Sequence, residues 1–119
     1  MEFNHYISCG NSHTVIVKED KTIWSFGLNN VGQLGLGHNE DQNIPQQINI
    51  DNVIAVSCGG DHNILLKDDA RKDYVRSIWS FGENNNGKLG LGHFEDQNSP
   101  QEISNFKMFR SLTKSATKC

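Results

Sequence analysis

Two cysteine–histidine pairs are the first residues whose types and spacing could bind a metal. Cys9 lies four residues before His13, and Cys58 four residues before His62. Thiolate and imidazole groups are zinc ligands, so the four side chains could form one tetrahedral site. Because the pairs occupy equivalent positions of a repeat, however, we expect them to lie one repeat apart and to point the same way. We therefore predict no metal, a small buried cysteine, and a half-buried histidine that bonds to backbone.

Residues 82–88 read Gly-Glu-Asn-Asn-Asn-Gly-Lys and match the spacing of a phosphate-binding loop. Leu89 follows where such loops carry a magnesium-binding Ser or Thr, and Gly90-Leu91-Gly92 would not begin a helix. The equivalent of Lys88 in the first half of the chain is Gln33. These glycines and asparagines are typical of turns that need a positive φ, so no nucleotide or other cofactor is expected.

Histidines also precede carboxylates twice, in His38-Asn39-Glu40-Asp41 and His93-Phe94-Glu95-Asp96. Such groups could serve as general acid and base. No nucleophile or second carboxylate is placed opposite them, so we interpret both segments as solvated loops and expect no enzymatic activity.

An internal repeat must position all of these residues. Residues 23–46 and 78–101 differ at only five positions (28, 31, 33, 39 and 44 in the first copy), so 19 of 24 are identical. The shift between copies is 55 here and 49 around the cysteines, and the difference of six is an insertion between Lys67 and Ile78. A unit of about fifty residues indicates a supersecondary element that must pack on neighbours.

Eleven glycines, two prolines and no long run of helix formers favour an all-β fold. Four strands are expected in each copy. In the first copy they lie near 4–9, 13–18, 22–26 and 45–50. In the second they lie near 53–58, 62–67, 77–81 and, weakly, 100–104. Trp24 and Phe26 should project to one side of their strand and Ile23 and Ser25 to the other.

The pattern Cys-Gly-x-x-His, then Trp-Ser-Phe-Gly-x-Asn-x-x-Gly-x-Leu-Gly-Leu-Gly-His, then Pro resembles the repeat of the regulator of chromosome condensation family. The residues that carry it are Cys9, Gly10, His13, Trp24, Gly27, Asn29, Gly32, Leu34, Gly35, Gly37 and Pro45, then Cys58, Gly59, His62, Trp79, Gly82, Asn84, Gly87, Leu89, Gly90, Gly92 and Pro100. The resemblance implies two adjacent four-stranded antiparallel blades of an incomplete β-propeller, with structural roles for these residues.

We divide the chain into a first repeat at 1–50, a second at 51–104, and a truncated or degenerate start of a third at 105–119, expected to be a frayed tail. Two blades cannot close a ring, so homo-oligomerisation is one way to cover their open faces. A remnant of a longer repeat protein is another interpretation.

Composition narrows the partners. The net charge is −3 with interspersed signs, which makes nucleic acid an unexpected partner, and no apolar run is long enough to span a bilayer. Three cysteines, Cys9, Cys58 and Cys119, form no disulfide framework, so an intracellular, cytoplasmic or nuclear location is expected.

The insertion is the best candidate for contact with a protein partner, because loops on a rigid β scaffold often carry recognition. A tolerated surface insertion without a partner is the alternative. Its charged and aromatic residues are Asp68, Asp69, Arg71, Lys72, Asp73, Tyr74 and Arg76. The predicted function is a non-enzymatic protein-interaction module. The resemblance also implies a second option, guanine nucleotide exchange on a Ran-type small GTPase.

Overall fold

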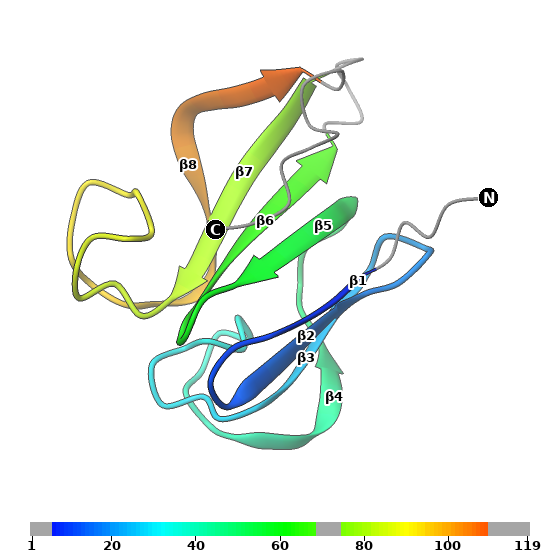
Figure 1. The fold of residues 1–119 in the computed structure, drawn as a ribbon, viewed down its shortest axis with the longest axis vertical. Helices are drawn as coiled ribbons and strands as arrows, with labels where there is room; N and C mark the ends of the chain where they lie inside the picture. The colour runs from blue at the N-terminus through cyan, green and yellow to red at the C-terminus, as the bar shows by residue number, and fades with distance from the viewer. Residues whose placement is uncertain (1–5, 69–74, 110–119) are drawn as a thin grey trace.

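The computed structural model describes residues 6–68 and 75–109 of the chain, with side chains described for 7–68 and 75–104. Two four-stranded antiparallel sheets make up this part, and they lie side by side in Figure 1. The strands of the first sheet are β1 (Tyr6–Cys9), β2 (His13–Val17), β3 (Ile23–Gly27) and β4 (Gln42–Gln47). The second sheet contains β5 (Val53–Cys58), β6 (His62–Asp68), β7 (Val75–Gly82) and β8 (Gln97–Phe109). Both sheets follow chain order, as predicted for two blades.

The short turns of the chain explain this meander. Gly10 and Gly59 open the tight β1–β2 and β5–β6 turns. The Gly10 amide donates to the His13 carbonyl at 2.9 Å, and the Gly59 amide donates to the His62 carbonyl at 2.8 Å. A side chain at Gly10 would collide with the His13 ring and with the carbonyls of Gly59 and Gly60. Longer loops at 28–41 and 83–96 connect β3 to β4 and β7 to β8.

Register fixes which side chains share a face of each sheet. Val15 is opposite Ser25 and Val17 opposite Ile23, so these side chains lie on one face of the first sheet, which we call its forward face. Phe26 is opposite Thr14 and lies on the rear face. The same logic puts Asn63, Leu65, Trp79 and Phe81 on the rear face of the second sheet.

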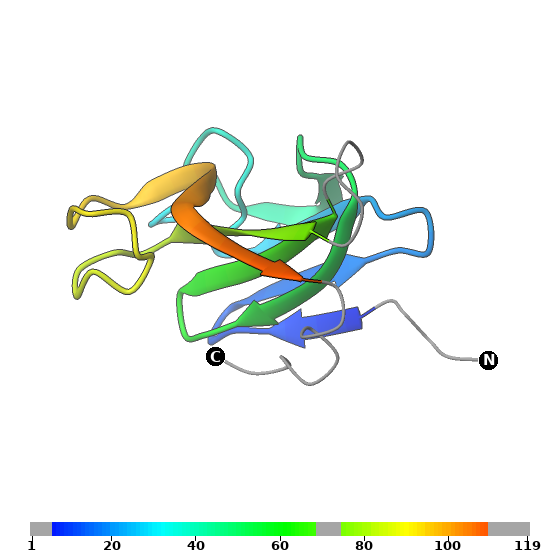
Figure 2. The same cartoon turned by 90° about the horizontal axis from the view of Figure 1, so that it is seen from above.

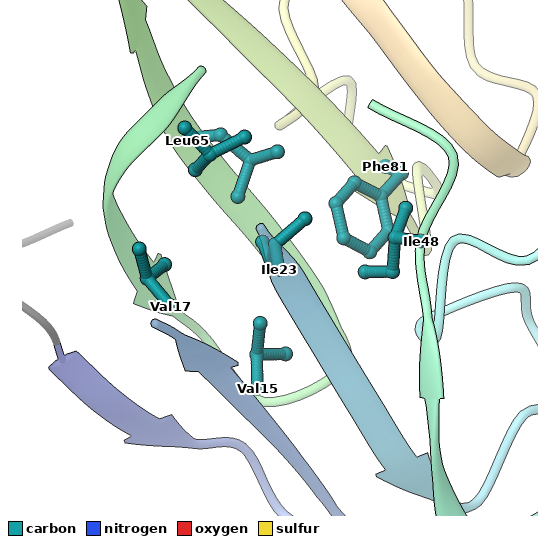
Figure 3. Close-up of a cluster of buried hydrophobic side chains, with 7 residues drawn as sticks. Val15, Val17, Ile23, Ile48, Leu65 and Phe81 are labelled. Carbon is teal, nitrogen blue, oxygen red and sulfur yellow. The ribbon is translucent and has the colours of Figure 1, made fainter. Parts of the chain in front are cut away.

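The core forms where the forward face of the first sheet meets the rear face of the second. Val15, Val17, Ile23, Ile48, Val53, Leu65 and Phe81 make up this cluster, each at most 1% exposed. Figure 3 shows Phe81 beside Ile48, and Leu65 on the side of Val17 and Ile23. Burial of each such side chain contributes about 1.5–3 kcal/mol, so the contact between sheets supplies much of the stability.

Several strand bounds differ from expectation. β4 begins at Gln42 rather than near 45, and β8 extends to Phe109 rather than ending near 104. Residues 107–109 of β8 pair with Val75, Arg76 and Ser77, which the insertion adds to the start of β7. The prediction of a frayed tail from 105 is therefore wrong for 105–109, because a lengthened β7 gives β8 a longer partner; residues 110–119 lie outside the described residues.

The predicted projection of the aromatic pairs is confirmed, but their burial differs between copies. Phe81 is fully buried, whereas Phe26 is only half-buried. Phe81 points at the first sheet, while no described residue forms a neighbouring sheet on the rear side of Phe26. Figure 2 shows the two sheets from above, with β1 and β2 next to β5. No helix in the described part of the chain is long and apolar enough to cross a membrane.

Candidate functional site

A chain of side-chain hydrogen bonds crosses the boundary between the sheets, which we call the seam. The Asn63 Nδ2 donates to the Gln33 carbonyl at 2.7 Å, so its Oδ1 accepts from His13 Nε2 at 2.9 Å. All three residues are buried, with 3% exposure for His13 and none for the other two. Nε2 is the donor in this arrangement, and Nδ1 has no hydrogen-bond partner among the described residues.

Backbone amides add further links across the seam. The Cys58 amide donates to Ser8 Oγ at 3.0 Å, and the Asn11 amide donates to the Gly60 carbonyl at 2.8 Å. At the far end of the seam, the Gly37 amide donates to the Asn98 carbonyl at 2.7 Å. Each bond joins the first copy to the second, so the register of one sheet on the other is fixed along its whole length.

Gly35 provides the seat for Phe81. Its φ is 70°, and a Cβ there would lie 2.7 Å from the Phe81 ring. Two separate constraints therefore require glycine at this position: the positive φ of the backbone and the close contact with the Phe81 ring. The equivalent Gly90 has a φ of 72°, but its nearest neighbour is Ile103 at an ordinary 3.6 Å, and Gly90 is exposed.

Asn29 and Asn84 organise the two long loops identically. The Asn84 side chain donates to the carbonyls of His93 and Glu95 at 2.9 and 3.0 Å and accepts from the Leu89 amide at 3.0 Å. Its own amide donates to Asp96 Oδ1 at 2.8 Å. Asn29 makes the same four bonds with His38, Glu40, Leu34 and Asp41. The repeated asparagine is thus a buried internal brace of its loop.

The side chains that the sequence offered for chemistry in the two long loops form bonds within those loops. His38 and His93 are exposed, and each Nδ1 accepts from the amide two residues later at 3.1 Å. Lys88 forms an ion pair with Glu83 in the same loop. Within the described ranges, no three His, Cys, Asp or Glu side chains are grouped as a metal site would need.

Two expectations about the cysteine–histidine pairs were wrong in detail. Cys9 is exposed and Cys58 partly buried, because Cys58 faces the seam while Cys9 lies on the open rear face of the first sheet. His13 bonds to the Asn63 side chain across the seam rather than to backbone. His62 is half-buried, and burial is the main cause that lowers its pKa below the ordinary 6.5, with Lys88 nearby adding to the effect.

The predicted insertion is described only at its two ends, because residues 69–74, and with them Asp69, Arg71, Lys72, Asp73 and Tyr74, lie outside the described residues. Asp68 and Arg76 pair across β6 and β7, with 3.0 Å between Oδ1 and Nε. Lys21 Nζ lies 3.5 Å from the other Asp68 oxygen. Asp68 therefore connects the hairpin to the first sheet and is not a free contact residue.

Sequence reasoning missed Asn63 and Gln33. Asn63 precedes an apolar run in β6, and the equivalent residue in the first copy is Thr14, so the repeat gave no hint of a shared role. The sequence feature that could have revealed Asn63 is a polar amide in a strand expected to be covered on both faces, because a buried amide needs a hydrogen-bond partner.

Comparison with known proteins agrees with this repeated architecture. The profile of the regulator of chromosome condensation (RCC1) repeat matches residues 20–66 and 77–116, and a second profile of the same repeat matches 5–33 and 53–88. The chain belongs to the RCC1 repeat family.

Its relatives are longer RCC1 repeat proteins. The chain is 31% identical to the dog X-linked retinitis pigmentosa GTPase regulator, covering 90% of this chain and 10% of that protein. It is 33% identical to the Arabidopsis thaliana ultraviolet-B receptor UVR8, covering 85% of this chain and 22% of the receptor. The crystal structure of yeast Prp20p shares the fold with a TM-score of 0.73 and 22% identity, over 84% of this chain and 25% of Prp20p. The chain thus spans between a tenth and a quarter of these proteins.

Proposed function

We propose that this RCC1 repeat pair is a non-enzymatic protein-interaction module. The observation that carries the proposal is the division of labour between identical and differing positions of the repeat. Within residues 78–101 the buried positions, such as Asn84, Leu89 and Ser80, are identical in both copies, and these three are bonded within the blade. Differing positions in the second copy, such as Asn86 and Phe94, are exposed. The scaffold is therefore constant, while its loop surface is free to vary for recognition.

Phe94 is the best anchor on this surface. Its side chain is 70% exposed, lies against Gly87, and replaces Asn39 of the first copy. An exposed aromatic ring gains more from burial in a partner than a charged neighbour does, and aromatic anchors dominate protein interfaces. Residues 69–74 of the insertion between Lys67 and Ile78 supply a second, charged contact that the first copy lacks.

Affinity capture with matched variants tests this function. Phe94→Ser and a deletion of residues 69–74 should each lose a bound protein that the wild type retains. Ile44→Ser is the control, because Ile44 is a similarly exposed apolar residue, 65% exposed, on β4. Equal recovery of every protein by wild type and both test variants would contradict recognition through these loops and favour a structural remnant.

Nucleotide exchange is a second candidate, favoured by the relatives. One relative is named a GTPase regulator, and the Prp20p structure is described together with binding to Gsp1p and histones. Release of labelled GDP from a Ran-type GTPase distinguishes the two functions. Accelerated release by the 119-residue chain would establish exchange; binding without acceleration would support a recognition module.

A further inference from the structure

The two outer faces of the described sheets reproduce the two halves of the seam. On the forward face of the second sheet, Ser57, His62, Ile64, Ser80 and Gly90 occupy the places that Ser8, His13, Val15, Ser25 and Gly35 occupy in the first. On the rear face of the first sheet, Ile7, Ile16, Trp24 and Phe26 occupy the places of Val56, Leu65, Trp79 and Phe81. Each of the two faces that meet at the seam therefore has a second, equivalent face on the outside of the described sheets.

Burial shows that both outer faces are less covered than their seam counterparts. Gly90 is exposed where Gly35 is buried, and Ile64 is half-buried where Val15 is fully buried. On the rear face, Ile7 is 66% exposed, whereas its counterpart Val56 packs against the core. Apolar side chains at these positions gain free energy when a matching face covers them.

An open hollow borders Gly90, the counterpart of Gly35. It has a volume of about 400 Å³ and is lined by Gly90, Leu91, His93, Gln101, Glu102 and Ser104. In the first copy the place of Gly90 is Gly35, against which the Phe81 ring packs. The residue that would enter the cavity by the same geometry is the one that matches Phe81, namely Phe26.

We propose that copies of this chain associate head to tail, with Phe26 of one copy seated at Gly90 of the next. The interface would continue the geometry of the seam from chain to chain. Such a contact joins two different faces, so it either closes into a ring or propagates. A propeller of about four to eight blades would need about two to four copies.

At one position the rear face of the first sheet differs from the rear face of the second sheet, which forms the seam. Thr14 occupies the place of Asn63, and a threonine cannot both accept from a histidine and donate to a backbone carbonyl with the reach of an asparagine amide. Between copies, His62 and the Lys88 carbonyl would consequently lack the amide that joins His13 and the Gln33 carbonyl within the chain. The contact between copies is therefore weaker than the seam, and Thr14→Asn should strengthen it.

Sedimentation of the full chain over a concentration series tests the association. Wild type should rise from 13.4 kDa toward multiples of that mass as concentration increases. Thr14→Asn should lower the concentration at half-association by about threefold to tenfold, the effect of one net hydrogen bond. The double variant Thr14→Asn with His62→Gln should lose this gain, and Ile44→Ser should behave as wild type. A mass of 13.4 kDa for both wild type and Thr14→Asn up to about 1 mM would overturn the proposal.

Complementary variants test the head-to-tail geometry. Phe26→Asp places a charge on the rear face only, and Gly90→Asn fills the seat only, with a residue that tolerates positive φ and has room beside Ile103. Each variant alone should remain monomeric, whereas a mixture should form a one-to-one dimer through the intact faces. Self-association of either variant alone, or no dimer in the mixture while wild type associates, would overturn this geometry. Circular dichroism of each variant confirms that the fold is retained.

Discussion

Gly35 and Gly90 show how one residue type serves two requirements at equivalent positions. Their φ angles, 70° and 72°, are nearly equal, so the backbone demands on them are the same. Only Gly35 also touches an aromatic ring, because only the first sheet has a described neighbour on its forward face. The pair therefore separates the cost of a left-handed backbone from the cost of a clash at the seam.

Alanine at each glycine measures that difference. Gly90→Ala should lose about 1 kcal/mol of unfolding free energy through backbone strain alone. Gly35→Ala should lose about 1–3 kcal/mol more, because its Cβ would meet the Phe81 ring at 2.7 Å. Urea unfolding at low protein concentration measures both. Equal losses would show that the ring moves aside without cost.

His62 should make stability depend on pH. Burial lowers its folded pKa below 6.5, while the unfolded chain keeps the ordinary value, so the unfolded state binds more protons as the pH falls below about 6.5. The unfolding free energy should therefore decrease from about pH 6.5 down to the lowered pKa. Comparing urea midpoints at about pH 7.5 and 5.5 tests this, and His62→Gln should flatten the slope. A variant with the wild-type slope would assign the dependence to other groups.

The strands and loops were largely predictable because the two copies of the repeat carry the same sequence pattern. The alternation in β3 and β7 and the Gly-rich turns placed eight strands in the right order, and identical copies confirmed one another. Four features were not predicted: the start of β4, the end of β8, the exposure of Cys9, and the partner of His13. Each depends on what lies beside a strand in space, and sequence spacing within one copy does not contain that information.

The long loops should depend on their internal asparagine. Asn84→Ala leaves the Leu89 amide and the carbonyls of His93 and Glu95 without this partner and should lower the unfolding free energy by about 2–4 kcal/mol. Asn85→Ala is the matched control, because Asn85 is exposed and its side-chain amide donates to the Glu83 carboxylate at the surface; its effect should stay within about 0.5 kcal/mol. Thermal unfolding followed by tryptophan fluorescence measures both. Comparable effects would refute the role of Asn84 as a brace.

At the scale of the molecule, Asn63 bonds the second sheet to the first copy, so we expect the two sheets to unfold as one unit. Asn63→Thr copies the residue of the first repeat and removes the two side-chain bonds that Asn63 makes across the seam, so it should lower the unfolding free energy by about 1–3 kcal/mol. Thr14→Asn, measured at a concentration where the chain is monomeric, should change it by less than about 0.5 kcal/mol. Denaturant curves read by both tryptophan fluorescence and circular dichroism test the coupling. If Asn63→Thr left the unfolding free energy unchanged, apolar packing alone would hold the sheets together.

The near identity of residues 23–46 and 78–101 also has a consequence for how the chain reaches its native state. Both segments carry the same Ile-Trp-Ser-Phe-Gly strand, so we expect either to be able to pair with β2 or with β6 while the chain refolds, which would give two mispaired arrangements. Such decoys are escaped only by partial unfolding. The few differences between the copies, above all Asn63 and the longer β7–β8 ladder, would then make the native strand pairing more stable than the mispaired ones.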